Sequence, residues 1–377
     1  MLRPAETAAH TALPAFFEDA AREHAATVAS VGGCDFDLRF ADRLIRLRFA
    51  GTELADALLS PFRPRRADFD ALGAETEEPL ASPSATIALW QEREVPGHAL
   101  PIPWRESDLA ARGLLRGPDG SDVMAVHELG YHATTLIDRR ARLLAHRVPD
   151  CAALPWWERA APLRPALFWA LSGADRHLVH AGAVGDERGG VLLAGAGGSG
   201  KTTVALAALA GGMKYVSDDY LLLHTHAEPV AWNLFATAKL DAGHLARFPR
   251  LAPTANISPD PVPDEKWVLD VTDLFPGALA PALPIRAIVV PRIRGGHSAL
   301  QSASAGVALL ALAPSTAFQM PYDDGAVVAS LAALVRSVPA FVLDVGDDVG
   351  ELPVAIDRVL DTVAADGVAV DTERVVL

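Results

Sequence analysis

Cysteine is nearly absent from this 377-residue chain, which contains only Cys34 and Cys151. Two cysteines cannot build a disulfide framework, and their spacing matches no metal-binding motif. No uninterrupted apolar run reaches the length of a membrane span, and the first residues lack the charged-then-apolar pattern of a secretory signal. These absences predict a cytoplasmic protein without a membrane-embedded part.

Basic residues are outnumbered by acidic ones, and the formal net charge is −14. A surface with this charge argues against a nucleic-acid phosphate backbone as the main partner. It would suit a basic peptide or protein, although most acidic proteins are simply soluble. The sequence leaves open whether the chain forms homo-oligomers.

Lysine is scarce compared with arginine. Of the 33 basic residues, 29 are arginine and four are lysine, at positions 201, 214, 239 and 266. All four lie within one window of 66 residues. An ammonium group is a compact point charge that suits a phosphate, whereas a guanidinium group is a planar fork. We interpret Lys201, and with it Lys239 and Lys266, as positions where arginine would not serve; chance clustering is the alternative.

The chain does contain a glycine-rich phosphate-binding motif. Residues 195–202 fit the Walker A pattern G-x-x-x-x-G-K-[ST] without mismatch, between a short apolar strand pattern and an apolar helix pattern. A strand, a glycine turn and a helix N-terminus present backbone N–H groups to a polyphosphate. A glycine turn that binds nothing is the alternative. The predicted ATP-binding residues are Gly195, Ala196, Gly197, Gly198, Ser199, Gly200, Lys201, Thr202 and Thr203.

Two adjacent carboxylates follow the loop by 17 and 18 residues from Lys201. Asp218 and Asp219 are predicted to lie at the centre of a strand over residues 214–224. Side chains that are adjacent on a strand point to opposite faces, so one carboxylate could hold Mg²⁺ while the other faces an incoming hydroxyl group. A carboxylate near the transferred phosphate can accept the proton of the attacking oxygen. An Asp pair that only caps a turn is the alternative.

A histidine precedes the loop by 21 residues from Lys201. His180 lies in a buried strand pattern that runs over residues 176–184 and leads toward the loop strand. If these strands are neighbours, the imidazole ring lies near the terminal phosphate. A buried structural histidine is the alternative, and on spacing alone it is the more common case.

The remaining pattern divides the chain into two parts. Residues 1–150 begin with a helical pattern and continue with alternating strands, which predicts an α+β module for substrate recognition or assembly. A helix over residues 155–171 joins it to the second part. Residues 151–377 mix buried strands with apolar helices, which predicts an α/β catalytic domain.

Three motifs together resemble the HPr kinase/phosphorylase family: His180-Ala-Gly-Ala-Val, the loop at 195–202 and Tyr215-Val-Ser-Asp-Asp219. The resemblance covers about 40 residues closely and residues 175–300 loosely. It implies a phosphoenolpyruvate-carboxykinase-like P-loop kinase core. It also implies His180, Lys201 and Asp219 as catalytic residues, with Asp219 accepting the proton of a serine hydroxyl. Asp218 completes the site, and Thr202 replaces the serine that usually ligates Mg²⁺.

The chain departs from that family at several points. Gly197 stands where the family usually has Ser or Thr, and no Glu-x-Arg-Gly segment follows the Asp pair, so phosphorylase activity is not implied. The N-terminal part does not match either. Three segments resemble instead the HPr-kinase-related proteins of biosynthetic clusters, among them lasso-peptide kinases: Lys239-Leu-Asp241, Lys266-Trp-Val-Leu-Asp and Leu312-Ala-Pro-Ser-Thr-Ala-Phe.

The sequence therefore predicts an ATP- and Mg²⁺-dependent kinase that acts on a serine hydroxyl of a peptide or small protein. Thr202 and Asp218 are the predicted metal ligands, and Lys239 and Lys266 are predicted to contact phosphates or the acceptor. Two alternatives remain: a regulatory module that binds and slowly hydrolyses ATP, and a kinase of a small metabolite.

Overall fold

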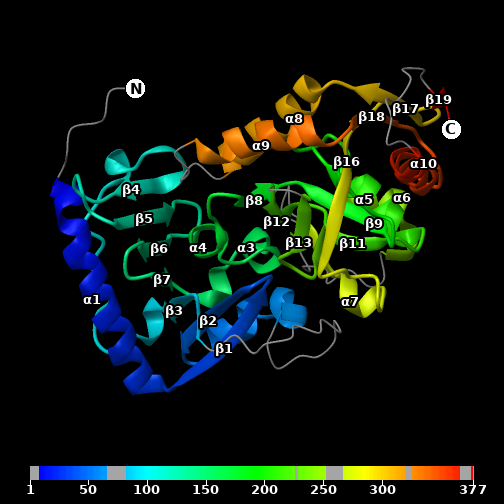
Figure 1. The fold of residues 1–377 in the computed structure, drawn as a ribbon. Helices are drawn as coiled ribbons and strands as arrows, with labels where there is room; N and C mark the ends of the chain where they lie inside the picture. The colour runs from blue at the N-terminus through cyan, green and yellow to red at the C-terminus, as the bar shows by residue number, and fades with distance from the viewer. Residues whose placement is uncertain are drawn as a thin grey trace. The chain divides into compact units, whose positions relative to one another are not determined.

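The computed structural model describes residues 8–65, 82–225, 228–251, 266–319, 325–365 and 375–376. The chain divides into two compact units, Met1–Leu171 and Ser172–Leu377 (Figure 1). Both units combine helices with mixed sheets, which makes this an α/β protein. The helical segment predicted over residues 155–171 belongs to the first unit, and Pro162 interrupts it because proline cannot continue a helix.

The first unit consists of one mixed sheet and its covering helices, with the strand order β1-β2-β3-β7-β6-β5-β4. Its helices are α1 (Ala8–Val31), α2 (Glu53–Leu58), α3 (Trp156–Ala160) and α4 (Arg164–Leu171), and its strands are β1 (Gly33–Phe40), β2 (Arg43–Ala50), β3 (Ala85–Gln91), β4 (Leu114–Arg116), β5 (Val123–Glu128), β6 (Ala133–Asp138) and β7 (Leu143–Val148).

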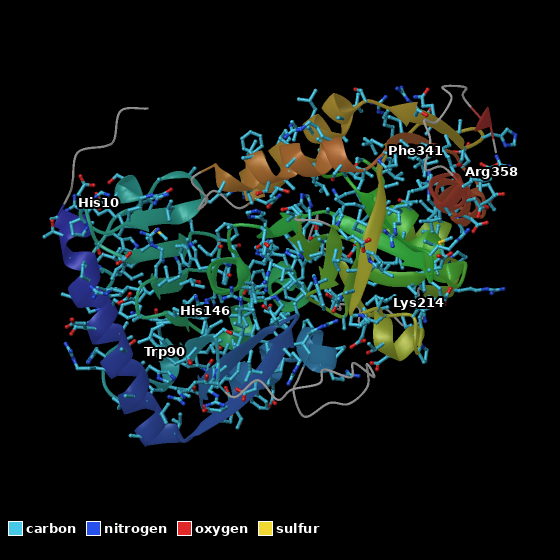
Figure 2. All side chains as sticks on the ribbon, in the orientation of Figure 1. His10, Trp90, His146, Lys214, Phe341 and Arg358 are labelled. Carbon is cyan, nitrogen blue, oxygen red and sulfur yellow. The ribbon has the colours of Figure 1, made fainter. Side chains whose placement is uncertain are left out.

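Helix α1 packs on one face of this sheet, and a buried polar contact fixes it there. The indole N–H of Trp90 on β3 donates to Glu23 on α1 at 2.8 Å, and the guanidinium of Arg147 on β7 lies 3.7 Å from the same carboxylate. His146 precedes Arg147 on the same strand and faces the other way, because side chains alternate along a strand. There it lies 2.9 Å from the hydroxyl of Thr135. Figure 2 labels Trp90 and His146 inside this unit.

We predict that this unit loses stability in mild acid, because one of its histidines is buried. Burial lowers the pKa of His127 from its usual 6.5 to about 4. The unfolded chain therefore binds a proton that the folded chain resists between these two values, so stability falls as pH decreases. We expect His127 to contribute a loss of about 2 kcal/mol between pH 7 and pH 5 in urea unfolding. His127→Asn should reduce the pH dependence by this amount, whereas His98→Asn, at an exposed histidine, should not change it. An unchanged profile in His127→Asn would refute the assignment.

The second unit contains the predicted site motifs. Its helices are α5 (Lys201–Ala210), α6 (Ala242–Arg247), α7 (Val271–Leu274), α8 (Ala305–Gln319), α9 (Ala326–Ser337) and α10 (Glu351–Ala365), and its strands are β8 (Arg176–His180), β9 (Gly182–Asp186), β10 (Gly189–Leu193), β11 (Lys214–Ser217), β12 (Tyr220–His224), β13 (Val230–Asn233), β14 (Thr237–Leu240), β15 (Trp267–Asp270), β16 (Ala282–Ile293), β17 (Ala299–Ala303), β18 (Ala340–Val345) and β19 (Val375–Val376).

The long strand β16 connects two halves of the main sheet of this unit. Its first residues pair with β13, which continues through β12 to β8, while later residues run parallel to β10 and β18. Strands β14 and β15 form a separate antiparallel pair. The loop strand β10 therefore lies in one half of the sheet, and the histidine strand β8 lies in the other.

The central strands are apolar throughout because helices cover both faces of the sheet. Val191 and Leu193 of β10 pack in a core cluster that includes residues of α5 and α10. Leu192, between them, packs in a second cluster that includes residues of α8 and α9, which lie side by side in Figure 1. Such double coverage is typical of the parallel strands of α/β proteins. Within the described ranges, no helix is long and apolar enough to span a bilayer.

Candidate active site

The glycine-rich segment forms a tight loop between the end of β10 and the start of α5. Gly198 and Gly200 have φ angles of 77° and 107°, in the left-handed region that favours glycine. A Cβ atom at Gly195 would lie 2.4 Å from the hydroxyl of Ser199, so this position also requires glycine. At Gly197 and Gly198 a Cβ would meet no atom within 4 Å, so these two positions border open space, and both line a cavity.

The side chain of Lys201 lies beneath this loop. Its Nζ donates to the carbonyl oxygens of Gly195 at 2.6 Å and Ala196 at 3.2 Å, and the residue is 6% exposed. Burial lowers the pKa of Lys201, and the nearby carboxylates of Asp219 and Asp218 act in the opposite direction. The ammonium group is therefore held at the centre of the loop by its backbone.

The Asp pair does not lie at the centre of a strand, so this part of the prediction was wrong. The predicted strand over 214–224 is two strands, β11 and β12, and Asp218 and Asp219 form the bend between them. Strand β11 pairs with β9 in one half of the sheet, whereas β12 pairs with β8 in the other. The bend is where the chain crosses from one half to the other.

The predicted strand over 176–184 is interrupted for the same reason. It ends as β8 at His180 and resumes as β9 at Gly182, because the chain crosses here in the opposite direction. The register opposes His180 to Tyr220 and Ala183 to Ser217, so the two crossings are adjacent. This adjacency brings the imidazole of His180 to the carboxylate of Asp219.

Asp218 is buried and faces the first turn of α5. The hydroxyl of Thr202 donates to its Oδ2 at 3.0 Å, and the phenol of Tyr215 donates to its Oδ1 at 2.9 Å. Burial raises the pKa of Asp218, and the neighbouring charge of Asp219 raises it further. A cation bound near Thr202 would relieve this unfavourable burial of charge.

Asp219 has the opposite electrostatic environment. Burial alone would raise its pKa, but an ion pair with Lys239 and the imidazole of His180, at 2.7 Å, hold it well below the usual value. Its side chain is 22% exposed, and it lines a cavity. The carboxylate is therefore ionised and oriented at neutral pH. The Nδ1 atom of His180 is buried without a hydrogen-bond partner among the described residues.

The loop, the Asp pair and His180 enclose one cavity of about 340 Å³. Its lining residues come from six segments that are separate in the sequence and lie within the second unit: His180, Ala196, Gly197, Gly198, Gly200, Lys201, Thr202, Thr203, Asp218, Asp219, Asp241, Gly243, His244, Arg247, Lys266 and Ile293. The structure thus gathers the predicted catalytic residues around the predicted phosphate-binding loop.

The residues present fit a polyphosphate and a hard divalent cation. The backbone N–H groups of the loop and the ammonium of Lys201, both of which line the cavity, are donors for phosphate oxygens. Over the part of the chain that the structure describes, no three His, Cys, Asp or Glu side chains gather into a metal site of their own. Thr202 and Asp218 are the oxygen donors that would hold Mg²⁺, which would neutralise charge on the phosphate oxygens.

The sequence did not identify the contribution of α6 to the cavity. Asp241, Gly243, His244 and Arg247 line it, but of these only Asp241 belonged to a segment noted in the sequence. The available signal was the capping pattern, since an Asp followed three residues later by a polar side chain is typical of a helix start.

Three of the four lysines lie at the candidate site, and the fourth does not. Lys201 and Lys266 line the cavity, and Lys239 pairs with Asp219. Lys214 instead donates to the carbonyl oxygen of Gly277 at 2.9 Å, at the start of β11 (Figure 2).

Comparison with known proteins adds little to this geometry. No family model and no curated protein matches the chain. Among solved structures, the chain is similar to the Hpr(Ser) kinase/phosphatase from Coxiella burnetii, with 16% identity and a TM-score of 0.23. The match covers 32% of this chain and 60% of that one. A TM-score this low does not establish a common fold, and we base the function on the site itself.

Proposed function

We propose that the cavity is the active site of an ATP- and Mg²⁺-dependent kinase that phosphorylates a serine hydroxyl of a peptide or small protein. The observation that supports this most directly is the different environment of two adjacent carboxylates. Asp218 accepts from Thr202 at the start of α5, whereas Asp219 is ionised and faces the cavity. One carboxylate is thus suited to a metal ion and the other to a hydroxyl group.

In this proposal the loop belongs to a phosphoenolpyruvate-carboxykinase-like P-loop core. Backbone N–H groups of the loop and Lys201 bind the phosphates, and Thr202 and Asp218 hold the cation. The bound Mg²⁺ supplies charge neutralisation for the phosphate oxygens. The protein mainly positions the reacting groups, as is usual in phosphoryl transfer.

Asp219 receives the proton of the attacking hydroxyl in this proposal. Its low pKa makes it a weak base, but in a loose transition state the nucleophile loses its proton late, so orientation matters more than basicity. His180 and Lys239 supply that orientation, because each contacts one oxygen of the carboxylate. We infer a positioning role for these two residues.

A peptide acceptor agrees with the net charge of −14, which favours a basic partner. The test is to incubate the protein with γ-labelled ATP, Mg²⁺ and serine-containing peptides of differing charge, each with a serine-to-alanine control. We expect label on serine peptides, most of all on basic ones, and none on the alanine controls.

Two other results would replace this proposal. Release of free phosphate with every peptide would indicate a nucleotide-hydrolysing regulatory module. Label that appears only on small molecules of a metabolite extract would indicate a metabolite kinase.

A further inference from the structure

A second group of polar side chains lines the cavity and has no role in the proposal above. His244 and Arg247 come from α6, and Lys266 directly precedes β15. Arg247 and Lys266 carry positive charge, whereas His244 contacts the carboxylate of Asp241, which lines the same cavity. The two cations add positive charge to the cavity beyond that of Lys201.

The first turn of α5 directs two hydroxyl groups to different partners at the cavity. Thr202 donates to Asp218, whereas the hydroxyl of Thr203 lies 3.2 Å from Nε2 of His244. Successive residues of a helix are rotated by about 100°, so neighbouring side chains necessarily point in different directions. The Thr202 hydroxyl thus contacts the Asp pair, and the Thr203 hydroxyl contacts α6.

The histidine on α6 is fixed in its orientation. Asp241 caps this helix by accepting from the backbone N–H of His244 at 2.9 Å, and its carboxylate lies 2.8 Å from Nδ1 of the same ring. This leaves Nε2 directed to Thr203. Arg247 follows His244 by three residues, so both side chains lie on the same side of the helix.

Arg247 has an unsatisfied donor. Its Nη1 atom is buried and has no hydrogen-bond partner among the residues that the structure describes. A buried guanidinium N–H without an acceptor is unfavourable, and the planar fork of arginine suits two oxygens of a phosphate group. With Lys266 on the same cavity, an anion is the ligand that these side chains would bind.

We propose that Arg247 and Lys266, beside the contact between His244 and Thr203, form the subsite for the nucleotide phosphate closest to the nucleoside, which remains in the diphosphate product. This inference rests on the proposed function, because it takes a nucleoside triphosphate as the ligand of the loop. Lys201 and the loop hold the phosphates at the end of the phosphate chain that carries the transferred group, next to Asp218 and Asp219. The phosphate chain therefore continues toward Thr203 and α6.

Binding measurements test this subsite without any assay of phosphate transfer. Titration calorimetry with ATP, ADP and pyrophosphate should show that Arg247→Ala weakens ATP and ADP about tenfold, the loss of one charged hydrogen bond. Pyrophosphate binds in the loop alone and should change by less than about twofold. Lys266→Ala should show the same pattern. Arg250→Ala is the matched control, because Arg250 is exposed and lies outside the cavity.

Three results would overturn the subsite. The first is unchanged affinity for ADP in both variants, with or without a raised KM for the acceptor. The second is an equal loss for pyrophosphate and ADP, which would indicate a general electrostatic effect. The third is a wild-type protein that does not bind ADP, which would overturn the kinase proposal as well. Wild-type protein that binds ADP through Arg247 but phosphorylates no hydroxyl would contradict the kinase proposal alone.

Discussion

Asp219→Asn is expected to reduce phosphate transfer about 1,000-fold while ATP binding remains within about twofold of wild type. Loss of a positioned general base typically costs between about a hundredfold and ten-thousandfold in rate. The amide keeps the shape of the side chain but cannot accept the proton of the attacking hydroxyl. ATP binding survives because the hydrogen bonds that hold Lys201 go to carbonyl oxygens of the loop and not to this carboxylate. Turnover is measured with labelled ATP, and affinity by calorimetry.

The substitution also removes the carboxylate that pairs with the buried ammonium of Lys239. Removing one partner of a buried ion pair costs about 3–5 kcal/mol, so thermal unfolding must accompany the assay. Asp219→Asn combined with Lys239→Gln removes both charges of the pair and should remain inactive. Glu187→Gln makes the same chemical change on an exposed turn and should keep full activity. Wild-type turnover in either Asp219 variant would exclude the assigned role.

Lys201→Arg is expected to weaken ATP binding about 100-fold although the positive charge is kept. The ammonium of Lys201 lies 2.6 Å from the carbonyl oxygen of Gly195 in a nearly closed space. A guanidinium group is larger and planar, so it cannot enter this space without moving the loop. Affinity for ATP, measured by calorimetry, is the quantity to compare.

Lys214→Arg is the matched substitution, because Lys214 makes one partly exposed hydrogen bond to a backbone carbonyl oxygen. An arginine can make that bond equally well, so affinity for ATP should not change. Together the two variants test whether the rare lysines of this arginine-rich chain mark phosphate contacts. Equal affinity in Lys201→Arg and wild type would contradict the assigned role of the loop.

The loop could be predicted from the sequence because its determinants are local. Gly198 and Gly200 adopt left-handed φ angles that other residues rarely adopt, and the apolar residues on both sides form the expected strand and helix. The α/β class followed in the same way from the alternation of apolar strand and helix patterns.

The arrangement of the catalytic residues could not be predicted in this way. Both crossings between the halves of the sheet lie inside segments, 176–184 and 214–224, whose sequence resembles one continuous strand. What interrupts them is pairing with distant strands, as when His180 is placed opposite Tyr220. Periodicity within a segment carries no information about such partners. The sequence therefore named His180, Asp218 and Asp219 without showing that two of them meet.

The contribution of α6 was missed for a related reason. A six-residue helix shows less than two turns of periodicity, so its pattern is weak. It directly follows β14, which pairs with β15 outside the main sheet, and its contact with Thr203 joins residues 41 positions apart. The sequence pattern identified only Asp241 and the lysines on either side of it, Lys239 and Lys266, because lysine is rare in this chain.

A single-turnover experiment tests the central claim most directly. The protein is mixed in excess with γ-labelled ATP, Mg²⁺ and a serine-containing acceptor, and ADP, labelled acceptor, labelled protein and free phosphate are followed in time. Direct transfer predicts one labelled serine hydroxyl for each ADP formed, at the same rate, with no label on the protein. Free phosphate in place of labelled acceptor, or label that appears first on His180 or Asp219, would contradict it.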